Sequence, residues 1–589
     1  MSWPAPTEPA ATRPWTSRPW AVLAVVAFFG WSLVEAQVDP GRLLSSEALE
    51  GMGRFLRGLV PPDLSLHFLR VVALALVRTL SIAVAGTALA VLLAFPLSIL
   101  ATPRLFRTTR IAAEAPGGWG ATLLLAHLGA RTVLRLFRAV PDLLWALLFV
   151  VAVGLGPTAG TLAIAVSYAG VLGRVFADIF EGVETGAVKA LAASGGRRES
   201  LFLFAILPQA APGLVGYTLY SLECALRAAS VLGFVGAGGV GQEIQLSMRL
   251  FEYRQVSTLL LAFVAVMVAG EGLSRLFRLR FRKVQAGGAA PLTRGGTRLA
   301  YAVGLAVVLG SFWSVGLFDE TRAGLVGRIA RFVAALFPPD ISMAFLRSLA
   351  VPLRQTLAVA GAGTLLGMVL GGVLSLPATA SLGFPAAEAP GQTRASVRFL
   401  RRTLYFGARA VLAALRAIPE LLWVLLCILA VGFGPFAGVL ALGLHTAGVL
   451  GKLWSEALED VPPGPDEVVE AGGGGAAAQL AWAAWPQARE LVVSYALLRW
   501  EFNVRVSALV GFLGGGGVGL LLYNSIQLGF YDRVGTLVLL VFGLVTLSDA
   551  LSGALRQTLA VQTRRRSGAA VELAAARLAA EAGLIAPSG

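Results

Sequence analysis

The sequence predicts an all-α membrane protein with about twelve transmembrane helices, and two observations carry this prediction. Of the 589 residues, 57% are hydrophobic and only 14% are charged, and the mean hydropathy is +0.76. This composition excludes an ordinary soluble enzyme. Apolar runs of about 18 residues or more also recur along the whole chain, as helices that span a bilayer require.

The chain contains two copies of one sequence module. Residues 138–174 and 416–452 are identical at 22 of 37 positions, at an offset of 278 residues, and farther upstream the offset is 277. Shared apolarity alone does not produce this identity, so we infer a tandem repeat. The expected domains are a cytoplasmic N-terminal segment at 1–19, a first half at 20–282, a cytoplasmic linker at 283–297, a second half at 298–560 and a cytoplasmic tail at 561–589.

Six apolar spans are expected in each half. They lie near residues 20–37, 70–102, 120–156, 158–180, 209–235 and 255–278, and then near 298–317, 350–377, 405–433, 436–456, 488–513 and 534–557. An even number of spans gives both halves the same orientation, which makes the repeat parallel. Basic clusters at span ends, such as residues 275–283, follow the positive-inside pattern and predict cytoplasmic termini.

Several other features limit the function. The 48 Lys and Arg residues exceed the 33 Asp and Glu residues, but they form no basic patch with interleaved aromatics, so we expect no nucleic acid partner. The two cysteines and three histidines are scattered, and no metal site or disulfide is predicted. Pro-Pro-Asp segments at 61–63 and 338–340 are expected outside the membrane after an amphipathic stretch, and residues 569–584 are expected to form a cytoplasmic helix.

Between the fourth and fifth expected spans of each half lies a segment too polar and too rich in glycine to cross a bilayer. We call these the first helical loop, residues 189–208, and the second helical loop, residues 467–486. A proline follows a glycine by thirteen positions in both, as Pro208 follows Gly195 and Pro486 follows Gly473. The pattern predicts a helix, a glycine turn, a second short helix and a helix-ending proline in the cytoplasm.

Both loops resemble the coupling loop of type I ABC importer permeases, which reads Glu-Ala-Ala, three residues, Gly, nine residues and Ile-x-Leu-Pro. The segments at 416–423, 432–438, 445–452, 499–505 and 511–519 are together similar to the phosphonate permease family, twice over. The resemblance implies the type I importer fold, an extracytoplasmic substrate-binding protein and two copies of an ATPase that carry ATP and Mg. It also implies that the ATPase contacts the loops at Lys189, Ala190, Gly195, Pro208, Glu467, Gly473 and Pro486.

The two loops depart from the family pattern in different ways. The first has Lys189 where the pattern has Glu, and the second has a glycine run at 472–475 and Trp485 in place of Leu. Each glycine costs a helix about 1 kcal/mol relative to alanine. We therefore hypothesise that the second loop depends on its ATPase partner for its structure and that the halves are functionally unequal.

Four ionisable residues lie inside the fifth spans: Glu223 and Arg227, and at the same offset Glu501 and Arg505. Such residues are costly in a bilayer unless they are paired or face water. The i, i+4 spacing favours an ion pair within each helix. Either both arginines line the translocation path and attract an anion, or the Glu and Arg pairs are structural. Asn503 of the second half corresponds to Ala225 of the first, so a polar site formed here would be asymmetric.

Glycine-rich turns follow the fifth spans. Their candidate gate or packing residues are Gly236, Gly238, Gly239 and Gly241 in the first half and Gly514, Gly516, Gly517 and Gly519 in the second. We interpret them as allowing close helix approach and a bend, because neither a preceding strand nor a following acidic residue supports nucleotide binding. In the resemblance they lie near the external gate.

The chain has no Gly-x-x-x-x-Gly-Lys-Ser/Thr motif, so we expect no enzyme activity and no cofactor in the chain itself. The sequence therefore predicts a multi-pass permease of the plasma (inner) membrane that carries phosphonate or a related phosphorus oxyanion. The alternatives are a secondary transporter of two six-helix halves, a permease of the same fold for another small solute, and a membrane scaffold that does not transport. Which anion is carried depends on a binding protein outside this chain.

Overall fold

Helices form every regular element in the described part of the chain. The computed structural model describes residues 19–43, 45–102, 119–285, 294–322, 324–380, 395–461 and 464–581. The expected N-terminal segment up to residue 18, the centre of the linker at 286–293 and the last eight residues, 582–589, lie outside the described residues.

The helices of the first sequence half are α1 (Pro19–Glu35), α2 (Pro40–Leu43), α3 (Ser46–Gly58), α4 (Leu66–Ala101), α7 (Trp119–Ala139), α8 (Asp142–Val153), α9 (Pro157–Glu181), α10 (Thr185–Ala193), α11 (Arg198–Ser200), η2 (Leu201–Ile206), α12 (Leu207–Leu232), η3 (Gly233–Val235), α13 (Val240–Arg249) and α14 (Tyr253–Gln285).

The helices of the second half follow the same order. They are α15 (Arg294–Val315), α16 (Leu317–Arg322), α17 (Leu325–Ala335), α18 (Met343–Ser348), α19 (Ala350–Ala378), α21 (Ala395–Ala417), α22 (Glu420–Val431), α23 (Pro435–Glu459), α24 (Pro465–Ala471), α25 (Ala476–Ala478), η4 (Gln479–Ala484), α26 (Trp485–Val510), η5 (Gly511–Leu513), α27 (Gly517–Gln527) and α28 (Tyr531–Glu581).

The described part of the chain contains fewer candidate membrane-spanning helices than the twelve that the sequence predicts, so the twelve-helix topology stays a prediction. Among the described residues, seven helices are long and apolar enough, or ten if each of three bent pairs counts as one span. The expected first spans of the two halves correspond to α1 and α15, in which Leu23–Glu35 and Ala302–Val315 are apolar. The expected tail helix is present as the end of α28, which runs without interruption to Glu581.

The expected spans at 120–156 and 405–433 are not straight helices. They bend by 93° between Ala139 and Asp142 and by 97° between Ala417 and Glu420. Pro141 and Pro419 cause the bends, because each has an extended backbone, with ψ near 148° and 151°, and cannot donate a backbone hydrogen bond. An apolar composition that continues through the proline hides such a bend from a hydropathy pattern.

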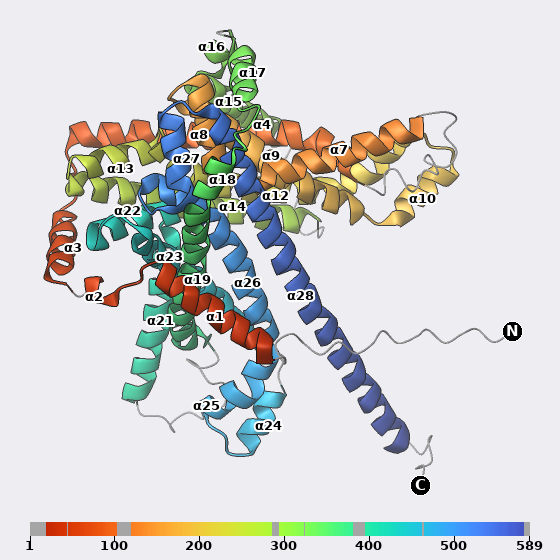
Figure 1. Cartoon of the computed structure of the whole chain (residues 1–589). Coiled ribbons are helices and arrows are strands. Elements are labelled where there is room, and N and C mark those ends of the chain that lie inside the picture. The colour runs from red at the N-terminus through yellow and green to blue at the C-terminus, as the bar shows by residue number, and fades with distance from the viewer. Residues whose placement is uncertain are drawn as a thin grey trace. The chain divides into compact units, whose positions relative to one another are not determined.

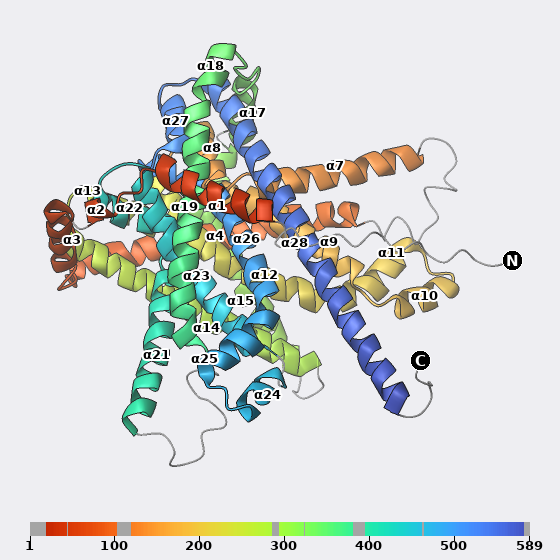
Figure 2. The same cartoon turned by 60° about the horizontal axis from the view of Figure 1, so that its bottom comes forward.

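The chain forms two compact units that do not coincide with the two sequence halves. One unit contains residues 1–43, 346–521 and 543–589, and the other contains 44–345 and 522–542. The helix α1 therefore packs within the unit built on the second half, against α19, which it crosses in Figure 1 and Figure 2. In the other unit α15 packs against α4 of the first half. The domain boundaries along the sequence stay a prediction.

Small residues bring the central helices of each unit together. α4 packs against α9 in one unit, and α19 packs against α23 in the other. A Cβ atom added to Gly371 of α19 would lie 3.1 Å from the carbonyl oxygen of Ala447 and 3.1 Å from the amide nitrogen of Gly451 on α23. The backbones approach this closely only because no side chain separates them, as is common where helices associate in membranes.

The Pro-Pro-Asp segments are fixed by equivalent contacts in the two sequence halves. The Thr258 hydroxyl donates to the Asp63 carbonyl oxygen at 2.8 Å, and the Thr536 hydroxyl donates to that of Asp340 at 2.8 Å. Hydrogen bonds from Ser342, followed by the charge of Arg533, lower the pKa of the Asp340 carboxyl. Amphipathic helices α3 and α17 precede these segments, as the sequence predicts.

The packing at Gly371 generates a stability prediction. Gly371→Ala inserts a methyl group between α19 and α23, so we expect it to lower the free energy of unfolding by about 1–3 kcal/mol. The thermal midpoint of the detergent-solubilised chain, followed by tryptophan fluorescence, measures this effect. Gly310→Ala in α15 is the control, because its added methyl group meets nothing within 4 Å and should not lower the midpoint. An equal loss in both variants contradicts the packing argument.

Candidate functional site

Both helical loops adopt the helix, glycine turn and second helix that their sequences predict. In the first, α10 ends at Ala193 and the chain turns at Gly195, whose φ is 81°. In the second, α24 ends at Ala471 and the chain turns at Gly473, whose φ is 80°. The Gly196 amide donates back to the Leu191 carbonyl at 3.0 Å, and the Gly474 amide donates back to the Val469 carbonyl at 2.9 Å. These bonds close the helix ends, and the left-handed φ favours glycine at both turns.

The expectation that Pro208 and Pro486 end a helix is wrong. The helical path runs from α11 through η2 into α12, and from α25 through η4 into α26, with each proline in the first turn of the longer helix. Each proline lacks the amide that would donate to the preceding turn, and it lies within two residues of the end of a π-helical turn. The turn before each proline is a π-helix, η2 or η4, which changes the backbone pairing at this point.

The predicted contact residues of both loops are exposed: Lys189, Ala190, Gly195, Pro208, Glu467, Gly473 and Pro486. Large apolar side chains next to them are exposed too, including Phe204 at 75% and Trp482 at 78%. Figure 1 shows α24 and α25 beside the end of α26, to which η4 connects them. Phe204 and Trp482 lie at the start of the candidate spans Leu201–Val235 and Gln479–Leu513, so either lipid or a protein partner can cover these apolar side chains.

The expected ion pairs within the fifth spans do not form. Glu501 of α26 pairs with Arg556 of α28 at 3.2 Å, and Arg505 of α26 pairs with Asp549 of α28 at 3.5 Å. These contacts join two helices and not two turns of one helix. The i, i+4 spacing placed each Glu beside its Arg on one face, but a neighbouring helix offers each group a closer partner of opposite charge.

The equivalent residues of the first half are arranged differently. Among the described residues, no ion pair joins Glu223 to Arg227, and buried Glu223 Oε2 and Arg227 Nε have no hydrogen-bond partner. Buried polar atoms without a partner are costly, which marks the Arg227 guanidinium for interaction with water or an anion and the Glu223 carboxylate for interaction with water.

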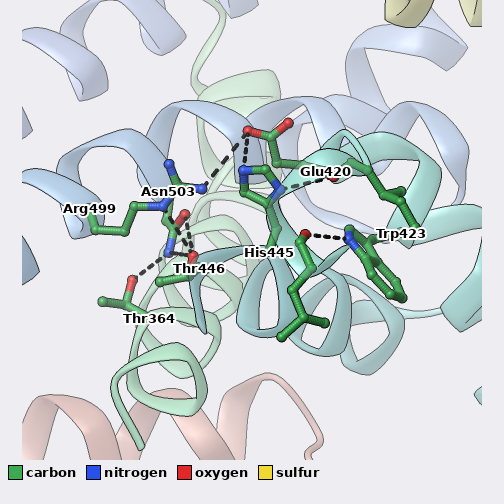
Figure 3. Close-up of polar contacts among 9 residues, drawn as sticks. Thr364, Glu420, Trp423, His445, Thr446, Arg499 and Asn503 are labelled. Atoms are coloured by element: carbon green, nitrogen blue, oxygen red, sulfur yellow. Dashed lines mark hydrogen bonds and ion pairs between the residues drawn. The ribbon is translucent and has the colours of Figure 1, made fainter. Parts of the chain in front are cut away.

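Asn503 lies at the centre of a buried hydrogen-bond network in Figure 3. It is fully buried, and its amide nitrogen donates to the Thr364 hydroxyl of α19 at 2.9 Å and to the Thr446 hydroxyl of α23 at 3.0 Å. The Thr446 hydroxyl donates to the Asn503 amide oxygen at 3.2 Å. One side chain of α26 thus connects α19 and α23.

Arg499, one helical turn before Asn503, extends this network toward α22. Its Nε donates to the Thr446 hydroxyl at 3.3 Å, and its Nη2 lies 3.9 Å from Glu420 Oε1. The same carboxylate oxygen lies 3.5 Å from Nε2 of His445. The carbonyl oxygen of Ile418 lies 3.0 Å from His445 Nδ1 and can only accept a hydrogen bond, so Nδ1 is the donor in this contact. Figure 3 shows these side chains converging from α22, α23 and α26.

The first half lacks this network. At the offset of 278, Asp142, Ser167, Ser221 and Ala225 stand in place of Glu420, His445, Arg499 and Asn503. Thr87, the counterpart of Thr364, keeps a buried hydroxyl oxygen that has no hydrogen-bond partner. The loss of the amide at Ala225 explains the unpaired hydroxyl. The two repeats therefore share a backbone but differ in buried charge.

The bend before α22 is held by a contact that recurs in both halves. The indole nitrogen of Trp423 donates to the Leu415 carbonyl at 3.1 Å, and that of Trp145 donates to the Phe137 carbonyl at 3.3 Å. These carbonyls lie at helix ends before the proline bends, where backbone acceptors lack partners within the helix. The repeated segment that includes Pro-Glu-Leu-Leu-Trp thus positions Glu420 toward the network.

The glycine-rich turns pack as the sequence predicts. Gly236, Gly238, Gly239, Gly514, Gly516 and Gly517 all have positive φ. The amide of Val240 donates to the Thr79 hydroxyl at 2.9 Å, and the amide of Val518 donates to the Thr356 hydroxyl at 2.9 Å. Added Cβ atoms at Gly241 and Gly519 would collide with the carbonyl oxygens of Ser230 and Ala508. Glycine is thus needed for close approach.

Sequence reasoning did not assign a role to Glu420, His445, Arg499 or Thr446. The available signal was the difference between the halves, since the offset pairs Ser167 with His445 and Ser221 with Arg499 within otherwise similar segments. Asp549 and Arg556 also have equivalents in the sequence, Glu271 and Arg278, which marks a repeated charge pattern. Among the described residues, no group of three side chains is arranged to hold a metal ion.

Comparisons with known proteins find clear similarity. A family model described as "Binding-protein-dependent transport system inner membrane component" matches residues 118–283 and 381–561. The phosphate-import permease protein PhnE of Mycolicibacterium smegmatis is 34% identical over 520 residues, covering 86% of this chain and 88% of the relative. The phosphite transport system permease protein PtxC of Stutzerimonas stutzeri is 38% identical over 259 residues, which is 44% of this chain and 87% of PtxC.

The network generates a matched pair of stability predictions. Thr364→Val removes a hydrogen-bond acceptor of the buried Asn503 amide, and we expect a loss of about 1 kcal/mol in the free energy of unfolding. Thr87→Val makes the same change where the hydroxyl has no partner, and it should cause no loss. Thermal unfolding of the solubilised chain compares the two variants. Equal midpoints contradict a role for the Asn503 bond in stability.

Proposed function

The chain belongs to the family of binding-protein-dependent transport system inner membrane components, and we propose that it forms the translocation pathway for phosphonate or a related small phosphorus oxyanion. It is a multi-pass inner-membrane permease of an ABC importer and is not itself an enzyme. The names of its relatives, which cover phosphate, phosphite and phosphonate permeases, support this substrate class.

The observation that carries the proposal is the pair of exposed helical loops. A permease without its own nucleotide site needs partners that convert ATP hydrolysis into movement. The two loops have the same glycine-turn geometry, with φ of 81° at Gly195 and 80° at Gly473, and both expose apolar side chains. Two copies of an ATPase subunit, one per loop, would bury these surfaces, and the ATPase would hold ATP and Mg.

The orientation follows from this assignment. If both loops meet cytoplasmic ATPases, both termini are cytoplasmic, and the binding protein docks on the opposite side, near the Pro-Pro-Asp segments. Twelve crossings in two parallel six-helix repeats of the type I importer fold require that α1, α15 and each of the three bent pairs also cross the membrane. The proposed halves are residues 20–282 and 298–560, joined by a cytoplasmic linker at 283–297.

Substrate contacts are assigned to the charges of the fifth spans. Buried Arg227 Nε and Arg505 Nε have no hydrogen-bond partner, so each guanidinium keeps a donor that an anion can accept. Glu223 and Glu501 limit the net positive charge, which keeps an anion from binding too tightly to leave. Asn503 uses both ends of its amide within the protein, so we assign it a structural role beside the pathway.

ATP binding to the partners would draw the two loops together and open the pathway toward a loaded binding protein, and hydrolysis would reset it. The glycine turns at 233–241 and 511–519 would serve as the external gate. They combine positive φ values with close backbone contacts, so they set the direction of α13 and α27.

The energy source separates this function from a secondary transporter with two six-helix halves. We expect phosphonate uptake into proteoliposomes that contain the chain, its ATPase and its binding protein to require ATP. Vanadate, which traps the ATPase, should reduce uptake at least tenfold, whereas an uncoupler should leave it unchanged. Uptake that persists with vanadate and collapses with the uncoupler contradicts the proposal.

The two helical loops can be compared by one substitution in each. Arg in place of Gly195 or Gly473 strains a left-handed turn. We expect the larger loss of permease-stimulated ATPase activity from Gly195→Arg, about tenfold. The glycine run at 472–475 lets the second loop absorb more distortion.

Gly475→Arg is the control for added bulk and charge, because Gly475 faces open space. It should change the stimulated ATPase activity less than twofold. Equal losses after Gly195→Arg and Gly473→Arg count against unequal halves.

A further inference from the structure

A small cavity with cationic walls lies between α21 and α23, outside the site described above. It has a volume of about 200 Å³ and is lined by Arg409, Leu412, Ala413, Arg416, Lys452, Ser455 and Glu456. We call it the α21–α23 pocket. It lies toward the end of α23 that leads to α24, and hence on the helical-loop side of this unit.

The cations of the pocket differ in how they are paired. Arg409 Nη2 lies 2.8 Å from Glu459 Oε1, and Lys452 Nζ lies 3.5 Å from Glu456 Oε1. Arg416 is half-buried, and among the described residues no hydrogen bond or ion pair reaches its guanidinium. The forked donors of this guanidinium are therefore available to an anion that enters the pocket, and hydrogen bonds between charged groups are stronger than those between neutral ones.

The same basic pattern recurs in the first half. Arg131, Arg138 and Arg174 stand at the positions of Arg409, Arg416 and Lys452, and Asp178 stands at that of Glu456. Arg174 and Asp178 interact at 3.2 Å, much as Lys452 and Glu456 do. The polar network around Asn503 was not kept between the halves, whereas this cluster was. An incidental arrangement of charges would not be expected to persist while nearby buried polar residues diverged.

We propose that the α21–α23 pocket binds a phosphorus oxyanion group, with Arg416 as its principal ligand. The forked donors of arginine match a tetrahedral oxyanion, and Lys452 adds charge without a fixed geometry. Two sources can supply this group: a free phosphate or phosphonate ion, or the phosphate of an anionic phospholipid, since basic pockets between membrane helices bind such headgroups. That the ligand is a free phosphate or phosphonate ion rests on the proposed function of the chain.

Arg416→Gln tests the pocket in the full-length chain reconstituted in nanodiscs. In phosphatidylcholine, equilibrium binding of radiolabelled inorganic phosphate should weaken about tenfold in Arg416→Gln, as expected for one charge-assisted hydrogen bond. Arg398→Gln removes the same charge from an exposed position of the same helix and should bind like the wild type. Lys452→Gln provides a second pocket variant if Arg416→Gln lowers the thermal midpoint.

A second arm uses nanodiscs that contain phosphatidic acid and counts retained lipids by native mass spectrometry. One anionic lipid held by the wild type and by Arg398→Gln, but lost from Arg416→Gln, identifies the lipid phosphate as the ligand. If neither experiment distinguishes the pocket variants from Arg398→Gln, the pocket proposal is wrong. This result would not contradict ATP-driven uptake by the chain. Conversely, absence of uptake by the wild-type complex refutes the proposed function and leaves the binding result intact.

Discussion

Close contact between glycine-rich helices is the constraint on which the rest of each unit depends. In a bilayer, lipid tails compete with apolar side chains for helix surfaces, so helices associate through tight van der Waals contact and interhelical hydrogen bonds. Gly371 meets the backbone of Ala447 and Gly451, and the equivalent pair of helices in the other unit meets where Gly86 faces Ile164. Only this backbone separation brings Thr364 and Thr446 within reach of one amide, that of Asn503.

The buried network shows what the repeat kept and what it changed. Both halves keep the helix order, the proline bend with its indole contact, and the glycine turns. Only the second half has Glu420, His445, Arg499 and Asn503 together, and the first half leaves Thr87 unpaired where the amide is missing. Backbone geometry is therefore a shared property, whereas the network around Asn503 belongs to one unit.

Three groups of charged residues have different surroundings. The helical loops carry exposed residues beside exposed aromatics, which suits a protein partner. The fifth spans carry partly buried charges that pair with α28 in one unit. The α21–α23 pocket carries cations whose pairing is incomplete. In a chain with only 14% charged residues, each group must be compensated by a partner, by water or by a ligand, because an unpaired charge near lipid is costly.

The sequence by itself determined the repeat, the all-helical class, the two loops with their glycine turns, and the family. These are local or periodic features: the offset of 278, the apolar runs, and Gly195 and Gly473 are visible without knowing which helices meet. Only the tertiary structure decided that Glu501 pairs with Arg556, that Arg499 meets Glu420, and that α1 packs against α19. Spacing along one helix fixes which residues share a face, but the partner of a charge depends on which helix covers that face.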